Sequence, residues 1–191
     1  LGIIPGAGGT QRMPRLIGLE AALDMMLTGK PLTAAQAKQV GLLDEVVSGD
    51  LLSAALAFAR QLLAQGAGPR RTRERAVAGG ERVDEIIAAR RAQVAKTMRN
   101  RKTPGVLLDA VTAAVKLPFD EGIQAERAIS VEVEKSIEGR AFRHLFFGER
   151  ELRKIPGIGP AVKGRRVASV GIVGAGTMGG GIAMCFANAG I

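Results

Sequence analysis

The first twelve residues, Leu1 to Arg12, read LGIIPGAGGTQR. Four glycines and one proline lie between residues 2 and 9, and this density predicts a loop with unusual backbone angles or close contacts. The chain then enters a short helix, so we expect the backbone N–H groups of Gly6, Gly8 and Gly9 to be exposed at its start. Such donors can hold a water molecule or an oxyanion. From spacing alone, a purely structural turn is equally well supported.

Apolar periodicity and end signals predict a largely helical chain beyond this loop. Longer helices are expected over residues 19–28, 51–65, 81–99, 106–117, 121–137 and 139–154, with short ones over 10–17 and after a capping box at Thr33–Gln36. Pro104 and Gly105 are expected to break the chain before the helix at 106. In the helix at 121–137 the charged residues, Glu126 among them, are expected to point outward. Residues 42–47 read as extended.

A second glycine-rich motif, Gly174 to Gly179, reads GAGTMG. It follows an apolar stretch, 167–173, that is typical of a buried strand, and it opens a helical run over 178–189. This context favours a dinucleotide-binding turn over a glycine-rich turn without a ligand. In such a turn Gly174 allows the tight bend, Gly176 lets the backbone approach a pyrophosphate, and Gly179 lets the helix sit close to the strand. The helix N-terminus favours phosphate.

The chain is basic, with 27 lysines and arginines, 18 acids and a net charge of +9. Twelve of the cations and only four of the acids lie between Arg60 and Lys102. Such a block can attract anionic partners. It contains no aromatic residue to stack on bases, so a solvated helix face with a connector is favoured over a nucleic-acid surface. Attraction of a phosphate-rich small molecule is an intermediate interpretation.

Other residue types limit the chemistry. One histidine, His144, and one cysteine, Cys185, cannot form a multi-ligand zinc site or an internal disulfide. We expect Cys185 to be a packed thiol, and three phenylalanines, Phe142, Phe146 and Phe147, to pack between helices. No run approaches the roughly 20 apolar residues that cross a bilayer. No signal peptide is visible, and both ends of the chain look cut through folded elements.

Three stretches resemble known families. The string at 5–12, PGAGGTQR, is highly specific, and with residues 1–18, 29–34 and 37–47 it resembles the C-terminal half of the enoyl-CoA hydratase (crotonase) core. Residues 167–190 are similar to the start of the NAD domain of 3-hydroxyacyl-CoA dehydrogenase. Between them, residues 119–122, 126–127 and 141–150 resemble the helical linker of the multifunctional β-oxidation enzymes.

The resemblance implies a chemistry and its site residues. The hydratase adds water across the double bond of a 2-enoyl coenzyme A thioester by means of two glutamates. In the family both glutamates precede the position of Gly2, and the backbone N–H at the position of Gly6 helps to position the water. In the NAD domain the pyrophosphate contacts fall on Gly174, Gly176 and Gly179, with Thr177 and Met178 supplying N–H groups. No metal is implied, and the acid–base residues of both activities lie outside this chain.

The interpretation is therefore a fragment of an α/β parent enzyme, itself mainly α-helical. Four segments are predicted: the C-terminal part of a crotonase-like core at 1–65, a basic and helical segment at 66–154, a Pro/Gly linker at 155–166, and the truncated start of an NAD-binding Rossmann domain at 167–191. We expect the parent to be a hydratase and NAD-dependent dehydrogenase, and the 191-residue chain alone to be inactive.

Two alternatives remain. One is a basic helical nucleic-acid- or partner-binding module. The other is a free-standing nucleotide-binding protein, which the single predicted strand argues against. The favoured interpretation implies acyl-CoA substrates and a thiolase subunit or a second copy as protein partner, with no nucleic acid and no transmembrane segment. It implies a cytoplasmic location in a bacterium, and a peroxisomal or mitochondrial one in a eukaryote.

Overall fold

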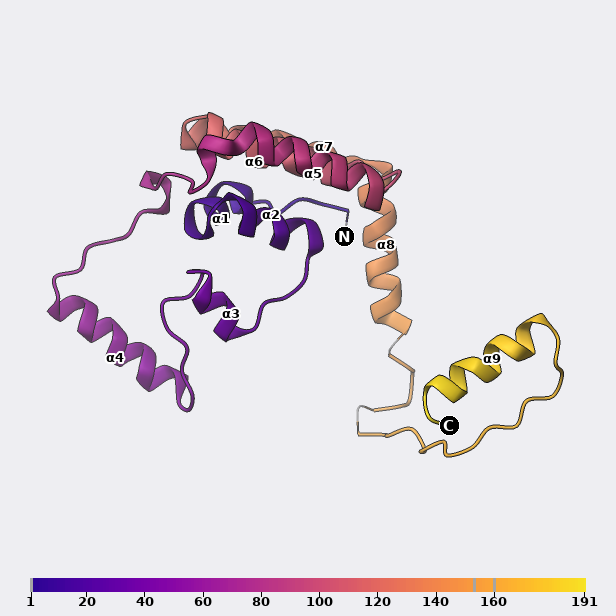
Figure 1. The fold of residues 1–191 in the computed structure, drawn as a ribbon. Helices are drawn as coiled ribbons and strands as arrows, with labels where there is room; N and C mark the ends of the chain where they lie inside the picture. Colours follow the sequence, from indigo (N-terminus) through magenta and orange to yellow (C-terminus); the bar gives the residue numbers. More distant parts are fainter. Residues whose placement is uncertain (1, 153, 160) are drawn as a thin grey trace. The chain divides into compact units, whose positions relative to one another are not determined.

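A computed structural model describes residues 2–152, 154–159 and 161–191 of the chain. The chain divides into two compact units, Leu1–Gly148 and Glu149–Ile191 (Figure 1). The described residues form helices and no strand, so the expectation of a mainly helical chain is confirmed. Residues 42–47, predicted as a short strand or extended segment, and residues 167–173, predicted as a strand, form no strand. A strand needs a neighbouring strand for its backbone hydrogen bonds, and the described residues supply none.

The first unit contains most of the helices. They are α1 (Gly9–Ile17), α2 (Leu19–Thr28), α3 (Ala34–Gln39), α4 (Leu51–Ala64), α5 (Val83–Thr97), α6 (Thr103–Lys116) and α7 (Phe119–Lys135), with short 3₁₀ turns η1 (Thr72–Glu74) and η2 (Gly80–Arg82). Helix α8 (Ile137–Leu152) also begins in this unit. Helix α6 starts earlier than predicted, with Pro104 in its first turn. Proline fits there because first-turn N–H groups have no partner within the helix.

Helix α6 is the centre of the first unit. It packs against α1, α2, α5 and α7, and α5, α6 and α7 lie alongside one another (Figure 1). Its inward positions Leu108, Ala110 and Val111 are completely buried. They join a core completed by Ile4, Leu19, Leu23, Val83, Ile86, Ile87, Val94 and Leu107. Burial of these apolar side chains is the main term that holds α1 and α2 against α5–α7.

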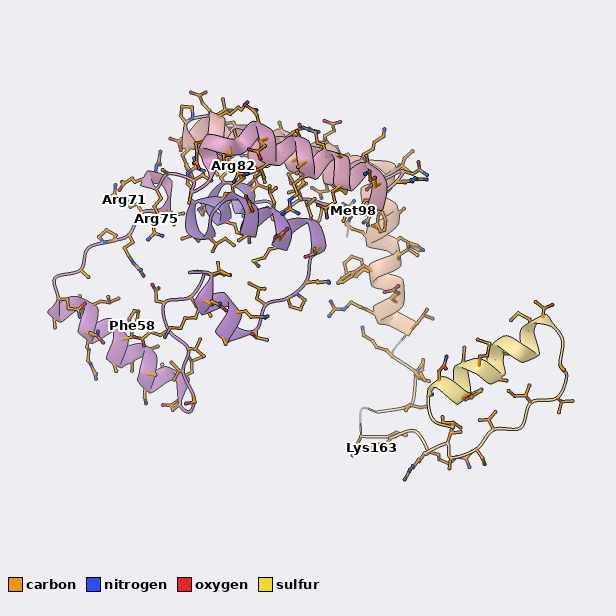
Figure 2. The ribbon with its side chains drawn as sticks, viewed as in Figure 1. Phe58, Arg71, Arg75, Arg82, Met98 and Lys163 are labelled. Atoms are coloured by element: carbon orange, nitrogen blue, oxygen red, sulfur yellow. The ribbon has the colours of Figure 1, made fainter. Side chains whose placement is uncertain are left out.

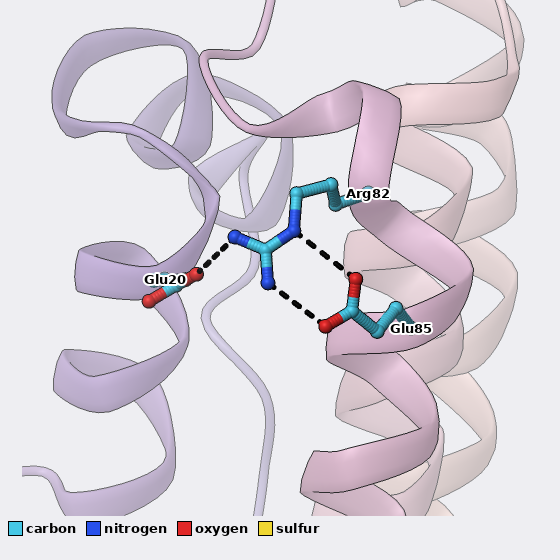
Figure 3. A network of polar contacts seen from close by, with 3 residues as sticks. All are labelled: Glu20, Arg82 and Glu85. Atoms are coloured by element: carbon cyan, nitrogen blue, oxygen red, sulfur yellow. Dashed lines mark hydrogen bonds and ion pairs between the residues drawn. The ribbon is translucent and has the colours of Figure 1, made fainter.

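Ion pairs on the surface add to this packing between α2 and α5. The Arg82 guanidinium lies 3.7 Å from the Glu20 carboxylate of α2 (Figure 3). It also donates two hydrogen bonds to Glu85 of α5, at 3.1 and 2.9 Å. These bonds hold the pKa of Glu85 below its ordinary value. Because all three side chains are more than half exposed, the network contributes little stability.

The N-terminus of α6 is capped by a side chain from the start of α8. The Glu138 carboxylate accepts hydrogen bonds from Lys102 N–H at 2.7 Å, and from Thr103 N–H and hydroxyl at 3.4 and 2.8 Å. Burial by itself raises the pKa of Glu138, but these bonds and the charge of Arg101 outweigh it, so the pKa lies below its ordinary value. The cap therefore ties two helices together through an ionised group.

Replacement of Glu138 by glutamine is expected to lower the free energy of unfolding by about 1 kcal/mol at pH 7, the usual size of a helix cap. A carboxyl whose pKa is lowered in the folded state stabilises the fold above its unfolded pKa, and that contribution is lost as the pH falls through the folded pKa. The difference between wild type and E138Q should therefore shrink below about pH 4.5. Urea unfolding, monitored by circular dichroism at several pH values, measures this difference in the free energy of unfolding. E149Q, on the exposed part of the same helix, is the control, and an equal loss there would contradict the cap.

Helices α3 and α4 carry little of the core. The capping box is confirmed, since Thr33 Oγ1 accepts from Gln36 N–H at 3.3 Å and Gln36 Oε1 accepts from Thr33 N–H at 2.9 Å. Helix α4 has no buried residue, although it is rich in leucine, and its Phe58 is half-buried (Figure 2). The sequence thus predicted these helices from local signals, while their apolar positions find few neighbours among the described residues.

The second unit holds the end of α8 and α9 (Thr177–Asn188). Residues 161–176 form neither helix nor strand. The expectation that Cys185 is packed is wrong, because its side chain is exposed on α9. No α9 residue is buried, since the described part of this unit contains no sheet to cover the helix.

Candidate functional site

The glycine-rich loop before α1 forms the tight turn that its composition predicted. Gly9 N–H donates to Gly6 O at 3.0 Å, which closes the turn. Ala7 and Gly8 both have positive φ, at 54° and 84°. Glycine adopts this conformation without strain, but alanine does so at a cost of about 1 kcal/mol. The loop at Ala7 must therefore be held in place by contacts from its surroundings.

A carboxylate from α7 provides the strongest of these contacts. Glu126 is only 2% exposed. Its Oε1 accepts from Gly8 N–H at 2.6 Å, and its Oε2 accepts from Thr10 N–H at 2.9 Å and from the Thr10 hydroxyl at 2.5 Å. The acid thus satisfies donors at the start of α1, where negative charge is favoured by the helix dipole.

The prediction that Glu126 points outward is therefore wrong. The signal that could have placed it is the spacing of Gly122, Glu126, Ile129 and Val133, which recur at helical intervals of four, three and four residues. Gly122, Glu126 and Val133 are buried, and Ile129 packs against the core. A glutamate on the buried side of an amphipathic helix needs hydrogen-bond donors, and the glycine loop supplies them.

Gln11 joins the same loop to two helices. Its side chain is fully buried, and its Nε2 donates to Ala110 O of α6 at 2.9 Å and to Thr10 Oγ1 at 3.0 Å. On the α7 side, a Cβ atom at Gly122 would lie 2.2 Å from Gln11 Oε1. Glycine at this position is what allows α7 to approach α1 so closely. Thr10 and Gln11 therefore connect the loop to α6 and α7 through their side chains as well as through the Thr10 backbone.

Of the three N–H groups predicted to be exposed, two are occupied. Gly8 donates to Glu126 and Gly9 donates to Gly6 O. Among the described residues, Gly6 N–H has no recorded acceptor, and Gly6 is exposed. The predicted water-positioning donor is thus the one glycine N–H of the three that the described loop leaves available.

A cavity of about 340 Å³ lies beside this loop. The loop and the start of α1 line one side, and α7 lines the other. The lining residues are Ala7, Gly8, Arg12, Ile123, Glu126, Arg127, Ser130 and Val131. Ser130 also approaches Gly6, because a Cβ atom built on Gly6 would lie 3.4 Å from Ser130 Oγ. The cavity could hold water or a small polar group next to the loop.

Two cations of the N-terminal segment, Arg12 and Lys30, differ in their surroundings. Arg12 braces the loop, since its Nη1 donates to Ala7 O at 2.5 Å. Its guanidinium also lies over the Phe119 ring with those of Arg15 and Arg73, at 5.1 to 5.6 Å from the centroid. Burial lowers the pKa of Arg15. Lys30 is exposed after α2.

The glycine motif of the second unit forms a tight turn before α9. Gly174 has φ of 104°. A Cβ atom at Gly179 would lie 2.1 Å from Gly174 O, so only glycine permits this closeness. A Cβ atom at Gly176 would meet nothing within 4 Å, which leaves the backbone open to a ligand. Helix α9 begins at Thr177 with Met178 in its first turn, and it has no side-chain cap. The strand expected before this turn is irregular.

Other candidate residues fall outside the glycine loop. His144 is exposed on α8. Phe142 contacts the Arg101 guanidinium at 4.6 Å, and Phe146 meets Phe147 edge to face at 5.4 Å, while Phe147 stays exposed. No three acidic, histidine or cysteine side chains of the described chain gather as a metal site.

The basic stretch is partly neutralised by neighbouring acids. Arg71 and Arg75 flank η1, and Arg82 ends η2 (Figure 2). Ion pairs involve six of its arginines: Arg70 with Asp44, Arg71 with Glu74, Arg73 with Asp120, Arg82 with Glu20 and Glu85, Arg90 with Asp24, and Arg91 with Asp109. This pairing supports the interpretation of the stretch as a solvated helix face with a connector.

None of the helices in the described part of the chain combines the length and apolarity of a membrane-crossing segment.

Comparisons with known proteins cover the whole chain. Residues 1–104 match the family described as enoyl-CoA hydratase/isomerase. The chain is 37% identical over 195 residues to the peroxisomal bifunctional enzyme of Cavia porcellus, which covers 100% of this chain and 27% of that protein. It is 36% identical over 198 residues to the enzyme of the same name from Homo sapiens, covering 99% of this chain and 27% of that protein. The chain thus spans about a quarter of the length of these relatives.

Proposed function

The chain belongs to the enoyl-CoA hydratase/isomerase family, and from this premise we propose that it is part of a multifunctional enzyme of fatty-acid β-oxidation. The observation that carries the proposal is the match of the entire chain, from the glycine loop to the glycine turn at 174–179, to bifunctional enzymes. A hydratase and a dehydrogenase on one polypeptide explain why two glycine motifs of different kinds occur in it.

The proposed first reaction hydrates a 2-enoyl-CoA. The water oxygen bonds to C3 and a proton is added at C2, so the double bond becomes a 3-hydroxyacyl thioester. Within this chain, Gly6 N–H would donate to the water, since the described loop supplies no acceptor for it and Gly6 is exposed. The glutamates that handle the protons lie upstream in the family, so we expect the 191-residue chain alone to be inactive.

The proposed second reaction oxidises the 3-hydroxyl group. When bound, NAD would supply the acceptor for the hydride from C3, and the hydroxyl proton would leave to a base outside this chain. The residues here would hold the cofactor's pyrophosphate through backbone N–H groups at Gly176, Thr177 and Met178, while Gly174 and Gly179 shape the turn. The names of the relatives favour a peroxisomal location in a eukaryotic source. A thiolase subunit or a second copy remains a proposed partner.

The test uses the full-length enzyme that contains this chain. We expect it to hydrate crotonyl-CoA and to reduce NAD with 3-hydroxybutyryl-CoA. Gly176→Ala is expected to raise the Kd for NAD at least about tenfold, equivalent to about 1.4 kcal/mol, because the added methyl group occupies the space of the pyrophosphate. Thermal stability should not change, since nothing lies within 4 Å of the new Cβ.

Gly181→Ala is the matched control on the same helix, because its Cβ also meets nothing within 4 Å. It should leave the Kd for NAD within about twofold of wild type, well under the tenfold that 1.4 kcal/mol represents. Titration calorimetry measures both constants. Equal affinity in wild type, G176A and G181A would remove the dinucleotide assignment, and a full-length protein without hydration activity would remove the hydratase assignment.

A further inference from the structure

The contact between Glu126 and the glycine loop joins residues that are far apart in the chain. The hydrogen bonds to Gly8 N–H and to Thr10 span 118 and 116 residues. Gly8, the residue before α1, has no side chain that could cap the helix. The cap is supplied by α7, a helix beyond residues 1–104 that match the hydratase family. The loop therefore takes its shape from a segment that the family match does not include.

The loop needs this support at its most strained point. Ala7 has positive φ and lies between Gly6, whose N–H is available, and Gly8, whose N–H is bonded to Glu126. Arg12 holds the Ala7 carbonyl from the other side. A carboxylate that accepts from both Gly8 and Thr10 fixes the peptide planes that follow Ala7, and so restricts the direction of the Gly6 N–H.

Helix α7 also reaches Gly6 itself. Ser130 lies one turn beyond Glu126, and both residues line the 340 Å³ cavity beside the loop. A Cβ atom on Gly6 would be 3.4 Å from Ser130 Oγ, which is ordinary contact. The same face of α7 thus supplies the Glu126 carboxylate that accepts from Gly8 and Thr10, which we call the Glu126 clamp. It also supplies the Ser130 hydroxyl next to Gly6, the proposed water donor.

We propose that Glu126 is a positioning residue for the hydration reaction, and that α7 belongs functionally to the hydratase site. Glu126 acts through the loop: it holds Gly8 and Thr10 so that Gly6 N–H points at the attacking water. The inference rests on the proposed function. Displacement of a catalytic group by about 1 Å can cost about 100-fold in rate, so loss of the clamp should reduce turnover more than substrate binding.

Glu126→Gln in the full-length enzyme tests this inference. The amide keeps the size of the side chain, but its NH₂ group cannot accept a hydrogen bond from one of the loop donors. We expect kcat for crotonyl-CoA hydration to fall about 10- to 100-fold, with KM changed less than about threefold. Oxidation of 3-hydroxybutyryl-CoA should be unchanged and serves as an internal measure of folded enzyme.

Two further variants keep the test decisive. Thr10→Val changes the shape little and removes one of the three hydrogen bonds to Glu126, together with the bond that the hydroxyl accepts from Gln11 Nε2. Two of the three bonds to Glu126 remain, so its loss of kcat should be smaller than that of E126Q. Glu132→Gln alters an exposed glutamate on the same helix and should leave both activities unchanged. Amide exchange in residues 6–10 should be faster in E126Q than in E132Q.

The outcomes separate the two proposals. If wild-type enzyme shows no hydration, the proposed function fails. If wild type is active and E126Q loses hydration and oxidation in the same proportion, or keeps full hydration kcat, the positioning role is overturned. If E126Q does not fold, Thr10→Val decides, and an unchanged hydration kcat there overturns the role.

Discussion

Replacement of Leu108 by alanine is expected to lower the free energy of unfolding of the first unit by about 3 kcal/mol. The side chain is fully buried in α6, the helix that contacts α1, α2, α5 and α7. Its truncation removes apolar burial and leaves a cavity among helices that cannot all move inward, and such substitutions cost about 2–5 kcal/mol. The chain has no tryptophan or tyrosine, so urea unfolding is followed by circular dichroism and by amide exchange in α6.

Leu63→Ala is the control for this prediction. Leu63 lies on α4 and is 78% exposed. Its replacement should change the free energy of unfolding by no more than about 0.5 kcal/mol. Because the chain has two units, the amides of α6 report the first unit more directly than the global signal does. A loss at Leu108 no greater than the loss at Leu63 would show that α6 is not the centre of the core.

Replacement of Gly139 by alanine is expected to destabilise the first unit by about 1–3 kcal/mol, the usual cost of overpacking. The new Cβ would lie 2.3 Å from Val133 O and 3.2 Å from Gly2 O. Both neighbours are backbone atoms, so the corner between α7 and α8 must open. This movement also disturbs the segment that leads into the glycine loop. Thermal and urea unfolding of the variant measure the loss.

Gly148→Ala in the same helix should not lower the free energy of unfolding and is expected to raise it slightly. Its Cβ would meet nothing within 4 Å. Alanine in a helix interior is favoured over glycine by up to about 1 kcal/mol, so this variant should be as stable as wild type or slightly more so. A Gly139→Ala variant as stable as Gly148→Ala would contradict the close packing at Gly139, since helix propensity alone favours alanine at both positions.

Features that depend on a few neighbouring residues could be predicted from the sequence. The helix at 19–28 and the capping box at Thr33 follow from apolar periodicity and from side chains that bond within three residues. The turn at 2–9 follows from its glycine content. The family also follows from sequence, because the string at 5–12 is specific. The signals for these features lie within a few neighbouring residues, although the glycine loop itself is held by Glu126 of α7.

Features that depend on a distant partner were missed. The extended segment at 167–173 has the composition of a buried strand, but a strand forms only where another pairs with it. Cys185 lies on an apolar helix, yet it is exposed because nothing described in its unit covers α9. Pro104 was expected to break the chain, but it lies in the first turn of α6. The N-terminus of that helix is capped by Glu138, which belongs to α8.

Local sequence patterns predicted the glycine turns and the helices of the first unit, and the string at 5–12 indicated the family. Which helix holds the glycine loop became clear from the packing of α7 against α1. A glutamate on a helix is read as solvated because ionised groups avoid the interior. Glu126 is buried because Gly8 and Thr10, more than a hundred residues earlier, supply the three donors that compensate its lost hydration. No pattern within α7 contains those donors.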